Sequence, residues 1–371
     1  MSTQEGILKP IKFNRKLGND FASTLKKRVK NYFKENNKSK YGGAKMYVKL
    51  VAMLSLFFVP YGIMISGAVS NVWILLGLFM TMGLAIAGIG MGVMHDANHG
   101  SFSKNDTINK IVGRVIGLVG GFRATWIIQH NILHHTYTNI YGYDEDISPA
   151  VSLLRFSPDD KRNKAHRFQH IYAWFFYGLM TVMWMTTKDF QQIARYKKMG
   201  LAQTQNKKYW KLILELVFFK VLFYAYMVVL PIIVLGSLGI AWWTVLLFIF
   251  AMHFVAGLTL GSVFQTAHVV PETDFPKPDR DLKIENNWMI HQLETTADFA
   301  PKSKIMAWFV GGLNYQVEHH LFPNISHIHY PAISKIVKET AKEFNVPYYV
   351  NKTFYAGLVA HKNMLKQLGR A

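Results

Sequence analysis

The most prominent pattern in the chain is a set of four long apolar stretches, each bounded by polar or basic residues. They cover residues 46–68, 72–94, 212–235 and 241–264. A helix needs about 20 apolar residues, at about 1.5 Å rise each, to cross the hydrocarbon core of a bilayer. Short uncharged links join the first two stretches and the last two. The pattern therefore predicts an all-α integral membrane protein with four transmembrane helices in two hairpins.

Lysine and arginine residues gather in front of the first and the third apolar stretch, whereas the two links carry no charge. Cytoplasmic segments that flank membrane helices carry an excess of these residues. We therefore expect both termini and residues 95–211 on the cytoplasmic side, in a helical cap. We also expect one membrane domain over 46–335, a basic and disordered N-terminal segment over 1–45, and a cytoplasmic C-terminal segment over 336–371.

Two further apolar stretches, 108–122 and 171–187, are shorter. The first is rich in glycine, and the second is aromatic and starts beside charged residues. Both are interpreted as interfacial or re-entrant helices rather than as a fifth span. A fifth span would also place the histidine clusters described below on opposite sides of the membrane.

Composition supports the membrane interpretation and narrows the chemistry. Hydrophobic residues make up 50% of the chain, and there is no cysteine, which excludes disulfides, thiolate zinc sites and iron–sulfur clusters. The formal net charge is +20, but the basic residues lie beside apolar runs, which favours a lipid bilayer over nucleic acid. No secretory signal peptide is evident. We expect a bacterial inner (cell) membrane protein, although an endoplasmic reticulum protein would share this topology.

Seven of the 15 histidines fall in three short clusters on the expected cytoplasmic side. The clusters are His95-Asp96-Ala97-Asn98-His99, His130-Asn131-Ile132-Leu133-His134-His135 and Gln316-Val317-Glu318-His319-His320. Helical residues four apart share a face, so both members of such a pair can reach one ion, whereas adjacent histidines diverge and suit two ions. An eighth histidine, His268, lies just past the fourth stretch, at the same expected depth as His95.

Eight gathered imidazoles predict a site with two metal ions. Burying them without metal would leave ring nitrogens without partners. They also exceed the four to six ligands of one first-row metal ion. Imidazole ligation without thiolate is compatible with iron, zinc or copper and does not choose among them.

The motifs HDANH, HNILHH and QVEHH resemble the three histidine boxes of membrane fatty-acid desaturases, HxxxH, HxxxHH and QxxHH. The order of the boxes and their spacing from the apolar stretches also match. The resemblance implies a diiron centre held by the seven box histidines, with His268 similar to an extra ligand after the fourth span. Gln316 replaces the first histidine of the third box, as in front-end and sphingolipid desaturases, and we expect it to line the site.

The resemblance also implies the reaction and the partners. Such an enzyme introduces a cis double bond into an acyl-lipid or acyl-CoA chain, using O2 and two electrons. Many front-end desaturases carry a fused cytochrome b5 domain with a His-Pro-Gly-Gly motif, which does not occur in this sequence. We therefore expect an external donor, a ferredoxin or a cytochrome b5-type protein, attracted by the positive charge.

Other polar residues near the clusters are candidates for supporting roles. We expect Asp96, Asp144, Asp146 and Glu318 to accept the second ring N–H of ligand imidazoles. We expect the acyl channel to be lined by Trp126, Thr295, Thr296 and Asp298.

Five of the seven remaining histidines are expected to have no catalytic role. Polar surfaces are predicted for His166, His170, His327, His329 and His361. His253 lies inside the fourth stretch, where a polar group faces either the acyl channel or another helix. The position of His291 stays open.

Three rival functions use similar residues. A diiron membrane hydroxylase or ketolase would have the same ligands and insert oxygen instead of forming a double bond. A metal transporter would place its ligands near the bilayer midplane, whereas these lie outside the apolar stretches. A haem-carrying membrane cytochrome needs paired axial ligands on facing helices and has no use for adjacent histidines.

Overall fold

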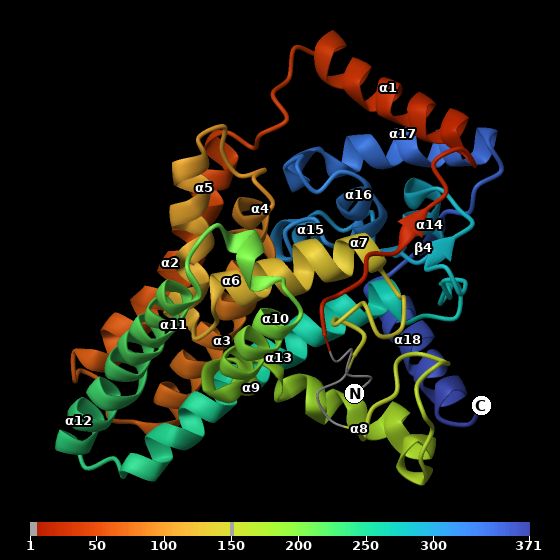
Figure 1. The fold of residues 1–371 in the computed structure, drawn as a ribbon. Coiled ribbons are helices and arrows are strands. Elements are labelled where there is room, and N and C mark those ends of the chain that lie inside the picture. The colour runs from red at the N-terminus through yellow and green to blue at the C-terminus, as the bar shows by residue number, and fades with distance from the viewer. Residues whose placement is uncertain (1–5, 149–151) are drawn as a thin grey trace.

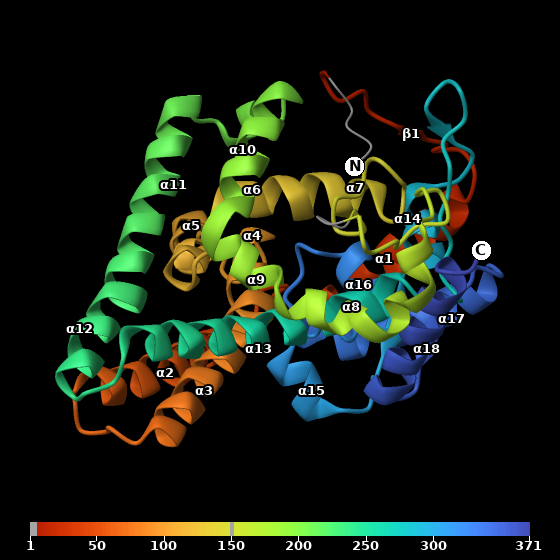
Figure 2. The ribbon, with the colours of Figure 1, turned by 90° about the horizontal axis from the view of Figure 1, so that it is seen from below.

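The computed structural model describes residues 6–148 and 152–371 and is mostly helical. Long helices gather at one end of the molecule, and short helices and two small sheets make up the other end (Figure 1; Figure 2). The long segments are formed by α2 (Ala44–Ile65), α3 with α4 (Val72–Gly92 and Met94–Asn98), α11 with η6 and α12 (Tyr209–Tyr224, Ala225–Val229 and Leu230–Ser237), and α13 (Trp242–His268).

Among the described residues, four helical segments are long and apolar enough to cross a membrane. They are Ala44–Ile65, Val72–Asn98, Tyr209–Ser237 and Trp242–His268. These segments confirm the four apolar stretches, but three of the four extend further than the sequence predicted. Hydropathy locates the apolar middle of a helix, whereas the backbone hydrogen bonds continue through polar residues such as His95 and His268.

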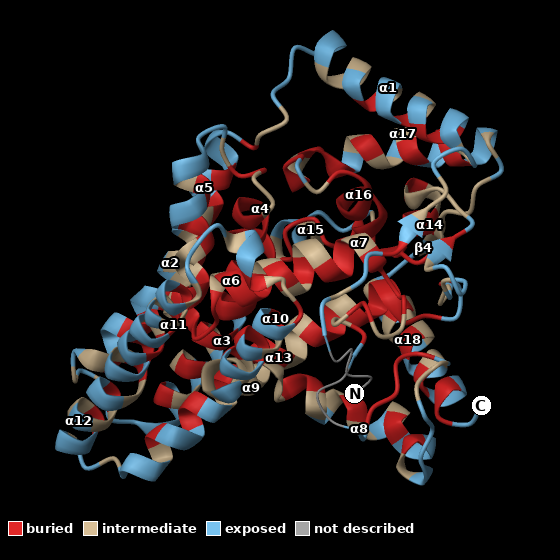
Figure 3. Ribbon diagram, viewed as in Figure 1, coloured by how far each residue is buried: buried red, intermediate tan, exposed pale blue. Residues whose placement is uncertain are grey.

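The outward faces of the four segments are apolar. Val51, Trp73, Phe218 and Leu247 are all more than half exposed, and Figure 3 shows exposed residues along α2, α11 and α12. Soluble proteins do not expose contiguous apolar faces of this extent. The faces therefore suit contact with lipid, as expected of a membrane protein.

Helix α3 lies between α2 and α13 and packs against both. Gly83 allows the close crossing of α3 and α13, because an added Cβ atom would lie 2.3 Å from the carbonyl oxygen of Met252. Helix α13 also packs along α8 (Gln169–Gly178), whereas α11 contacts the 3₁₀ segment η1 (Arg114–Val119). The core of the long-helix end is thus centred on α3 and α13.

Residues 108–122 belong to a sharply bent part of the chain. Segments Asp106–Val119 and Arg123–Tyr137 meet at 109°, the shape of a broken span or a re-entrant loop. Gly120 at the bend has a φ of 89°, a left-handed conformation that glycine adopts without strain. The second arm consists of α6 (Arg123–Trp126), the π-helical segment η2 (Ile127–His134) and α7 (His135–Tyr137).

The second ambiguous stretch, 171–187, is divided among three consecutive helical pieces, the first two of which pack against α13. After α8 come α9 (Met180–Met183), the π-helical segment η4 (Trp184–Lys188) and α10 (Asp189–Lys198). They form one side of the cavity described below. Short 3₁₀ turns precede α8 and follow α10, at Lys164–Phe168 (η3) and Ala202–Gln205 (η5).

The short-helix end holds most of the rest of the chain, whereas α5 (Asp106–Gly113) lies beside α2 and α4 (Figure 1). Two parallel pairs of strands tie distant segments together, β1 (Lys12–Phe13) with β2 (Lys283–Ile284) and β3 (Ala297–Phe299) with β4 (Tyr349–Asn351). The remaining helices are α14 (Trp288–Glu294), α15 (Lys304–Phe309), α16 (Gln316–Leu321), η7 (His327–His329), α17 (Tyr330–Glu343) and α18 (Phe354–Leu368).

The basic N-terminal segment, expected to be disordered, instead forms β1 and helix α1 (Asn19–Glu35). The buried side chains of Phe21, Leu25 and Val29 recur every four residues and pack with Ile333 and Val337 of α17. This amphipathic period stabilises the helix. The prediction of disorder was wrong because the many lysines masked a regular apolar face.

Candidate metal centre

Four separate elements bring the histidine clusters to one place. Helix α4 continues the second membrane segment and carries the first cluster, the bent arm η2–α7 carries the second, and α16 carries the third. His268 ends α13. A π-helical stretch inside an α-helix shifts the side-chain register and frequently marks a functional site, and here η2 spans His130 and His134.

Four imidazoles form a first group that we call the four-histidine group, made of His95, His99, His130 and His319. One ring nitrogen of each lies within 4.8 Å of the others. The Nε2 atoms of His95 and His130 are 3.0 Å apart. The Nε2 atoms of His99 and His319 are buried without a hydrogen-bond partner among the described residues. Such orphaned nitrogens are costly unless something binds them.

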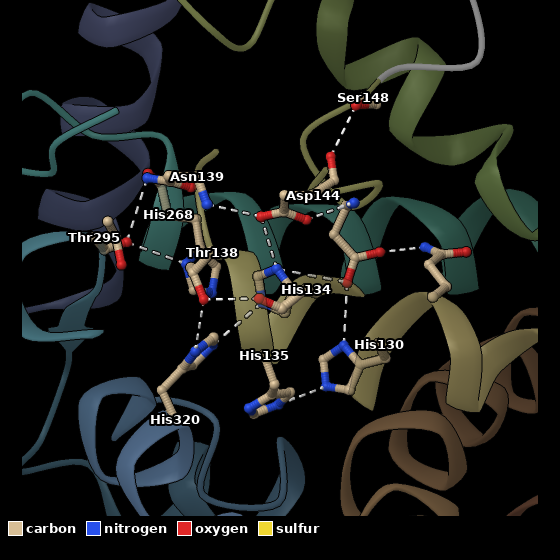
Figure 4. A network of polar contacts seen from close by, with 12 residues as sticks. His130, His134, His135, Thr138, Asn139, Asp144, Ser148, His268, Thr295 and His320 are labelled. Atoms are coloured by element: carbon tan, nitrogen blue, oxygen red, sulfur yellow. Dashed lines mark hydrogen bonds and ion pairs between the residues drawn. The ribbon is translucent and has the colours of Figure 1, made fainter. Parts of the chain in front are cut away.

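Three imidazoles form a second group, the three-histidine group, made of His134, His268 and His320. The Nε2 atoms of His134 and His320 are 3.2 Å apart. The Nε2 atom of His268 lies 3.1 Å from the side-chain nitrogen of Gln316. Figure 4 shows His134, His268 and His320 close together beside Asp144.

His135 lies between the two groups. Its Nε2 atom is 3.3 Å from Nε2 of His130 in the four-histidine group, and its ring stacks on His320 of the three-histidine group with centroids 4.4 Å apart. The structure therefore brings together all eight histidines that the sequence singled out.

The geometry fits two transition-metal ions. Metal–imidazole bonds of about 2.0–2.1 Å put neighbouring ligand nitrogens roughly 3 Å apart, and the separations here are 3.0–3.3 Å. Burial, reinforced by the neighbouring imidazoles, lowers the pKa of His319 and of His320 well below the usual value of 6.5. Both rings are thus neutral, which is the form that binds metal.

Most imidazoles of the two groups are oriented through their other ring nitrogen. Nδ1 of His130 lies 3.1 Å from Asp146, and Nδ1 of His134 lies 2.9 Å from Asp144. These two carboxylates lie where the sequence placed imidazole partners. Burial opposes ionisation of Asp146, but hydrogen bonds and charge from His130 and His134 outweigh it and hold the pKa of Asp146 below its usual range. Such partners fix the ring orientation of metal ligands.

Three further partners of the gathered imidazoles gave no signal in the sequence. Nδ1 of His320 lies 2.8 Å from Oε1 of Gln292. Nδ1 of His319 lies 3.3 Å from the hydroxyl of Tyr330, and Nδ1 of His268 lies 3.3 Å from the carbonyl oxygen of Thr295. Glutamine, tyrosine and a backbone carbonyl are too common in any sequence to be recognised as partners without the fold.

Asp96 lies next to His95 but does not take the expected position. Its carboxylate accepts from His327 Nδ1 at 2.9 Å and from the Ser326 hydroxyl at 3.2 Å, rather than from a box histidine. The other ring nitrogen of His327 lies 3.1 Å from Nζ of the buried Lys49. This chain of contacts fastens α4 to the segment after α16. Neighbouring side chains on a helix point in different directions, so Asp96 faces away from the imidazole of His95.

Glu318 likewise faces away from the imidazoles. It shares a buried cluster with Asp298, and the hydroxyl of Tyr348 donates to Asp298 at 2.6 Å and to Glu318 at 3.1 Å. Burial raises the pKa of Asp298 to about 6, and burial with the nearby Asp298 charge raises the pKa of Glu318 well above its usual value. Asp298 also accepts from the backbone N–H of Val317, so the cluster anchors the start of α16.

A cavity of about 910 Å³ reaches the four-histidine group. His95, His130, Trp126 and Gln316 line one part of it, apolar residues of α9 and α13 line the walls, and the exposed Gln191 and Lys198 of α10 line the opening. Such a volume is at the upper end of the range for small-molecule sites. An elongated apolar ligand with a polar end suits this lining.

The expected lining residues divide into two sets. Trp126 and Gln316 line the cavity, and the Trp126 ring centroid lies 4.6 Å from that of His130. Thr295, Thr296 and Asp298 do not line it: all are buried, and Thr295 contacts His268 through its carbonyl oxygen. All three residues follow α14, and Asp298 anchors the start of α16.

Four of the five histidines that were assigned to polar surfaces are buried: His166, His327, His329 and His361. His361 shows the reason, because its ring nitrogens lie 2.7 Å from the Tyr177 hydroxyl and 2.8 Å from the Val269 carbonyl oxygen. Partners from distant segments satisfy these rings, and sequence spacing did not reveal them. His170 is partly exposed.

The two undecided histidines are buried and lie outside the cavity lining. His253 of α13 has Nδ1 3.3 Å from the Thr181 hydroxyl, so it contacts another helix. His291 of α14 packs against Phe13 with ring centroids 5.0 Å apart. Burial lowers the pKa of His291 to about 4, which keeps it neutral.

Comparison with known proteins identifies a family model and several relatives that match most of this chain. The family model described as fatty acid desaturase matches residues 71–352. The sn-1 linoleoyl-lipid 6-desaturase of Arthrospira platensis is 34% identical over 96% of this chain and 94% of its own length. The acyl-lipid (8-3)-desaturase of Physcomitrium patens is 36% identical over 94% of this chain and 72% of its own length.

A third relative, Delta(5) fatty acid desaturase A of Dictyostelium discoideum, is 31% identical over 94% of this chain and 75% of its own length. The family model spans three of the four apolar segments and all of the gathered histidines, and each of the three relatives aligns with 94% or more of this chain. The chain therefore belongs to the fatty acid desaturase family.

Proposed function

We propose that this desaturase is a front-end acyl-lipid enzyme with a diiron centre. The observation that carries the proposal is the convergence of eight imidazoles in two groups at an apolar cavity. The four-histidine group would hold one iron, the three-histidine group the other, and His135 would complete the set from between them. When bound, the iron pair supplies the O2-derived oxidant that an unactivated C–H bond requires.

The protein's own residues bind and align the substrate. Met94, Leu260 and Phe264 line the cavity and would hold the acyl chain away from water. Trp126, packed against His130, would fix the chain at the reacting carbons. Asp144, Asp146 and Gln292 keep the ligand rings oriented throughout turnover. Holding reactants in a fixed geometry removes much of the entropic barrier.

The front-end assignment rests on Gln316 and on the relatives. Gln316 lines the cavity and contacts His268, so it shapes the site where other desaturases would place a histidine. The relatives carry the names 6-desaturase, (8-3)-desaturase and Delta(5) desaturase. A lipid-linked acyl chain is favoured over acyl-CoA because two of these names specify an acyl lipid or a linoleoyl lipid.

We propose the following arrangement in the cell. The four apolar segments form two membrane hairpins, and residues 95–211 with both termini form a cytoplasmic cap over the iron centre, within a bacterial inner membrane. A single catalytic domain covers 46–335. The basic flanks of the first and third segments support this orientation, and an external ferredoxin or cytochrome b5-type protein supplies electrons.

Double-bond mapping in a host of known lipid content tests the function. We expect new double bonds between an existing one and the carboxyl end, with the loss of two hydrogen atoms per product. Replacing His135 by alanine should abolish them, whereas His170→Ala, at a partly exposed ring outside the site, should not. Products that gain an oxygen atom would assign the hydroxylase alternative instead.

A further inference from the structure

Helices α1 and α17 lie side by side and turn their lysines outward. Their apolar faces meet through Leu25 and Val29 on one helix and Ile333 and Val337 on the other. The opposite faces carry exposed lysines that together define the α1–α17 ridge: Lys26, Lys27, Lys30, Lys34, Lys335, Lys338 and Lys342.

The lysines of the ridge do not stabilise the fold through ion pairs. Among the described residues, no ridge lysine has an ion-pair partner, and Glu343 of α17 is already paired with Arg28 at 2.6 Å. Lys26, Lys30 and Lys34 follow one another at intervals of four residues, a spacing at which like charges destabilise a helix. A surface that keeps such repulsion is suited to an acidic partner.

The ridge lies at the end of the molecule opposite α12 and the link between α2 and α3 (Figure 1; Figure 2). The apolar outward faces of the membrane segments are therefore remote from it. This placement favours a soluble protein partner over the lipid surface.

The ridge is also connected to the histidine site. Phe33 of α1 meets His329 edge-on, with ring centroids 5.0 Å apart. The next residue, the buried Tyr330, begins α17 and has its hydroxyl 3.3 Å from Nδ1 of His319. A partner seated on the ridge would thus be separated from the four-histidine group by a short, packed aromatic path.

We propose that the α1–α17 ridge docks an acidic, soluble one-electron carrier protein. The inference rests on the proposed function, which needs such a carrier. Reducing O2 to two waters takes four electrons and four protons. Two of each leave the substrate as the double bond forms, two electrons come from two reduced carriers, and two protons come from water.

The test measures binding to the full chain in lipid nanodiscs, with a plant-type [2Fe–2S] ferredoxin and a soluble cytochrome b5 domain as probes. The ridge variant carries Lys26→Glu, Lys30→Glu, Lys335→Glu and Lys338→Glu. A matched control carries Lys161→Glu, Lys362→Glu, Lys366→Glu and Arg370→Glu, four exposed cations away from the ridge. We expect the ridge variant to weaken binding at low salt by roughly tenfold or more and to flatten its salt dependence, because steering by exposed charges is screened.

Three results would overturn the inference. These are an unchanged Kd in the ridge variant, an equal loss in the control variant, and failure of the wild-type protein to bind either carrier. A further assay measures how the detergent-solubilised protein binds anionic vesicles. If the ridge variant loses vesicle binding but keeps carrier binding, the ridge is a lipid-binding surface instead. Because the readout is binding, its outcome is independent of whether double bonds form.

Discussion

The histidine centre depends on partners that hold most of its rings in place. The sequence was enough to select the eight histidines, because seven lie in three short clusters and His268 directly follows the fourth apolar stretch. It also selected Asp144 and Asp146. It did not find Gln292 or Tyr330, and it assigned His327 and His361 to the surface, because the contacts that satisfy these side chains come from segments far away in the chain.

Replacing Asp144 by alanine should weaken metal binding roughly 10- to 100-fold, the usual effect of removing a partner of a ligand histidine. Asp144 accepts from His134 Nδ1 and also from the backbone N–H of Asn139. Asp144→Asn keeps an acceptor and should retain more metal. Metal content after dialysis against a chelator measures the difference, with the exposed Asp281→Ala as control. Equal metal retention by Asp144→Ala and wild type would contradict this role.

At the scale of elements, a buried ion pair fixes the arm that carries the second histidine cluster. Nζ of Lys220 in α11 lies 2.7 Å from Asp189 of α10, and the hydroxyl of Thr125 in α6 donates to the same carboxylate at 2.6 Å. Lys220 also donates to the carbonyl oxygen of Gly120 at the sharp bend. The hydropathy pattern predicted the membrane segments. It could predict neither the angle of the bend nor this contact between three helices.

Lys220→Met should lower the free energy of unfolding by about 3–5 kcal/mol, because it leaves the buried Asp189 carboxylate without its cation. Adding Asp189→Leu should recover much of the loss, since no uncompensated charge then remains. Thermal unfolding in detergent, with the exposed Lys211→Met as control, measures both effects. A double variant less stable than Lys220→Met would show that the ion pair itself, and not charge compensation, matters there.

In the molecule as a whole, stability depends on pH because most of the buried imidazoles of the histidine site resist protonation. Burial lowers the pKa of His319 and of His320 well below 6.5, so the folded protein binds fewer protons than the unfolded chain. Stability from these groups is present above about pH 6.5 and is lost as the pH falls toward their folded pKa values. The sequence alone predicted the residues of the site. It did not predict that they are completely buried, and the dependence of stability on pH rests on that burial.

Metal-free protein should therefore show a lower Tm as the pH is reduced from about 8 to about 5.5, and loaded protein should release metal over the same range because protons compete for the ligand nitrogens. Scanning calorimetry with and without metal measures both. A Tm that is constant or rises toward acid would contradict the neutral, buried state of the rings.

Metal analysis of the purified, active protein is the decisive test of the diiron centre. We expect two iron ions per chain, and a marked loss in His320→Ala with no loss in His170→Ala. Active protein that contains zinc or copper in place of iron, or a single ion that His320→Ala leaves bound, would contradict it.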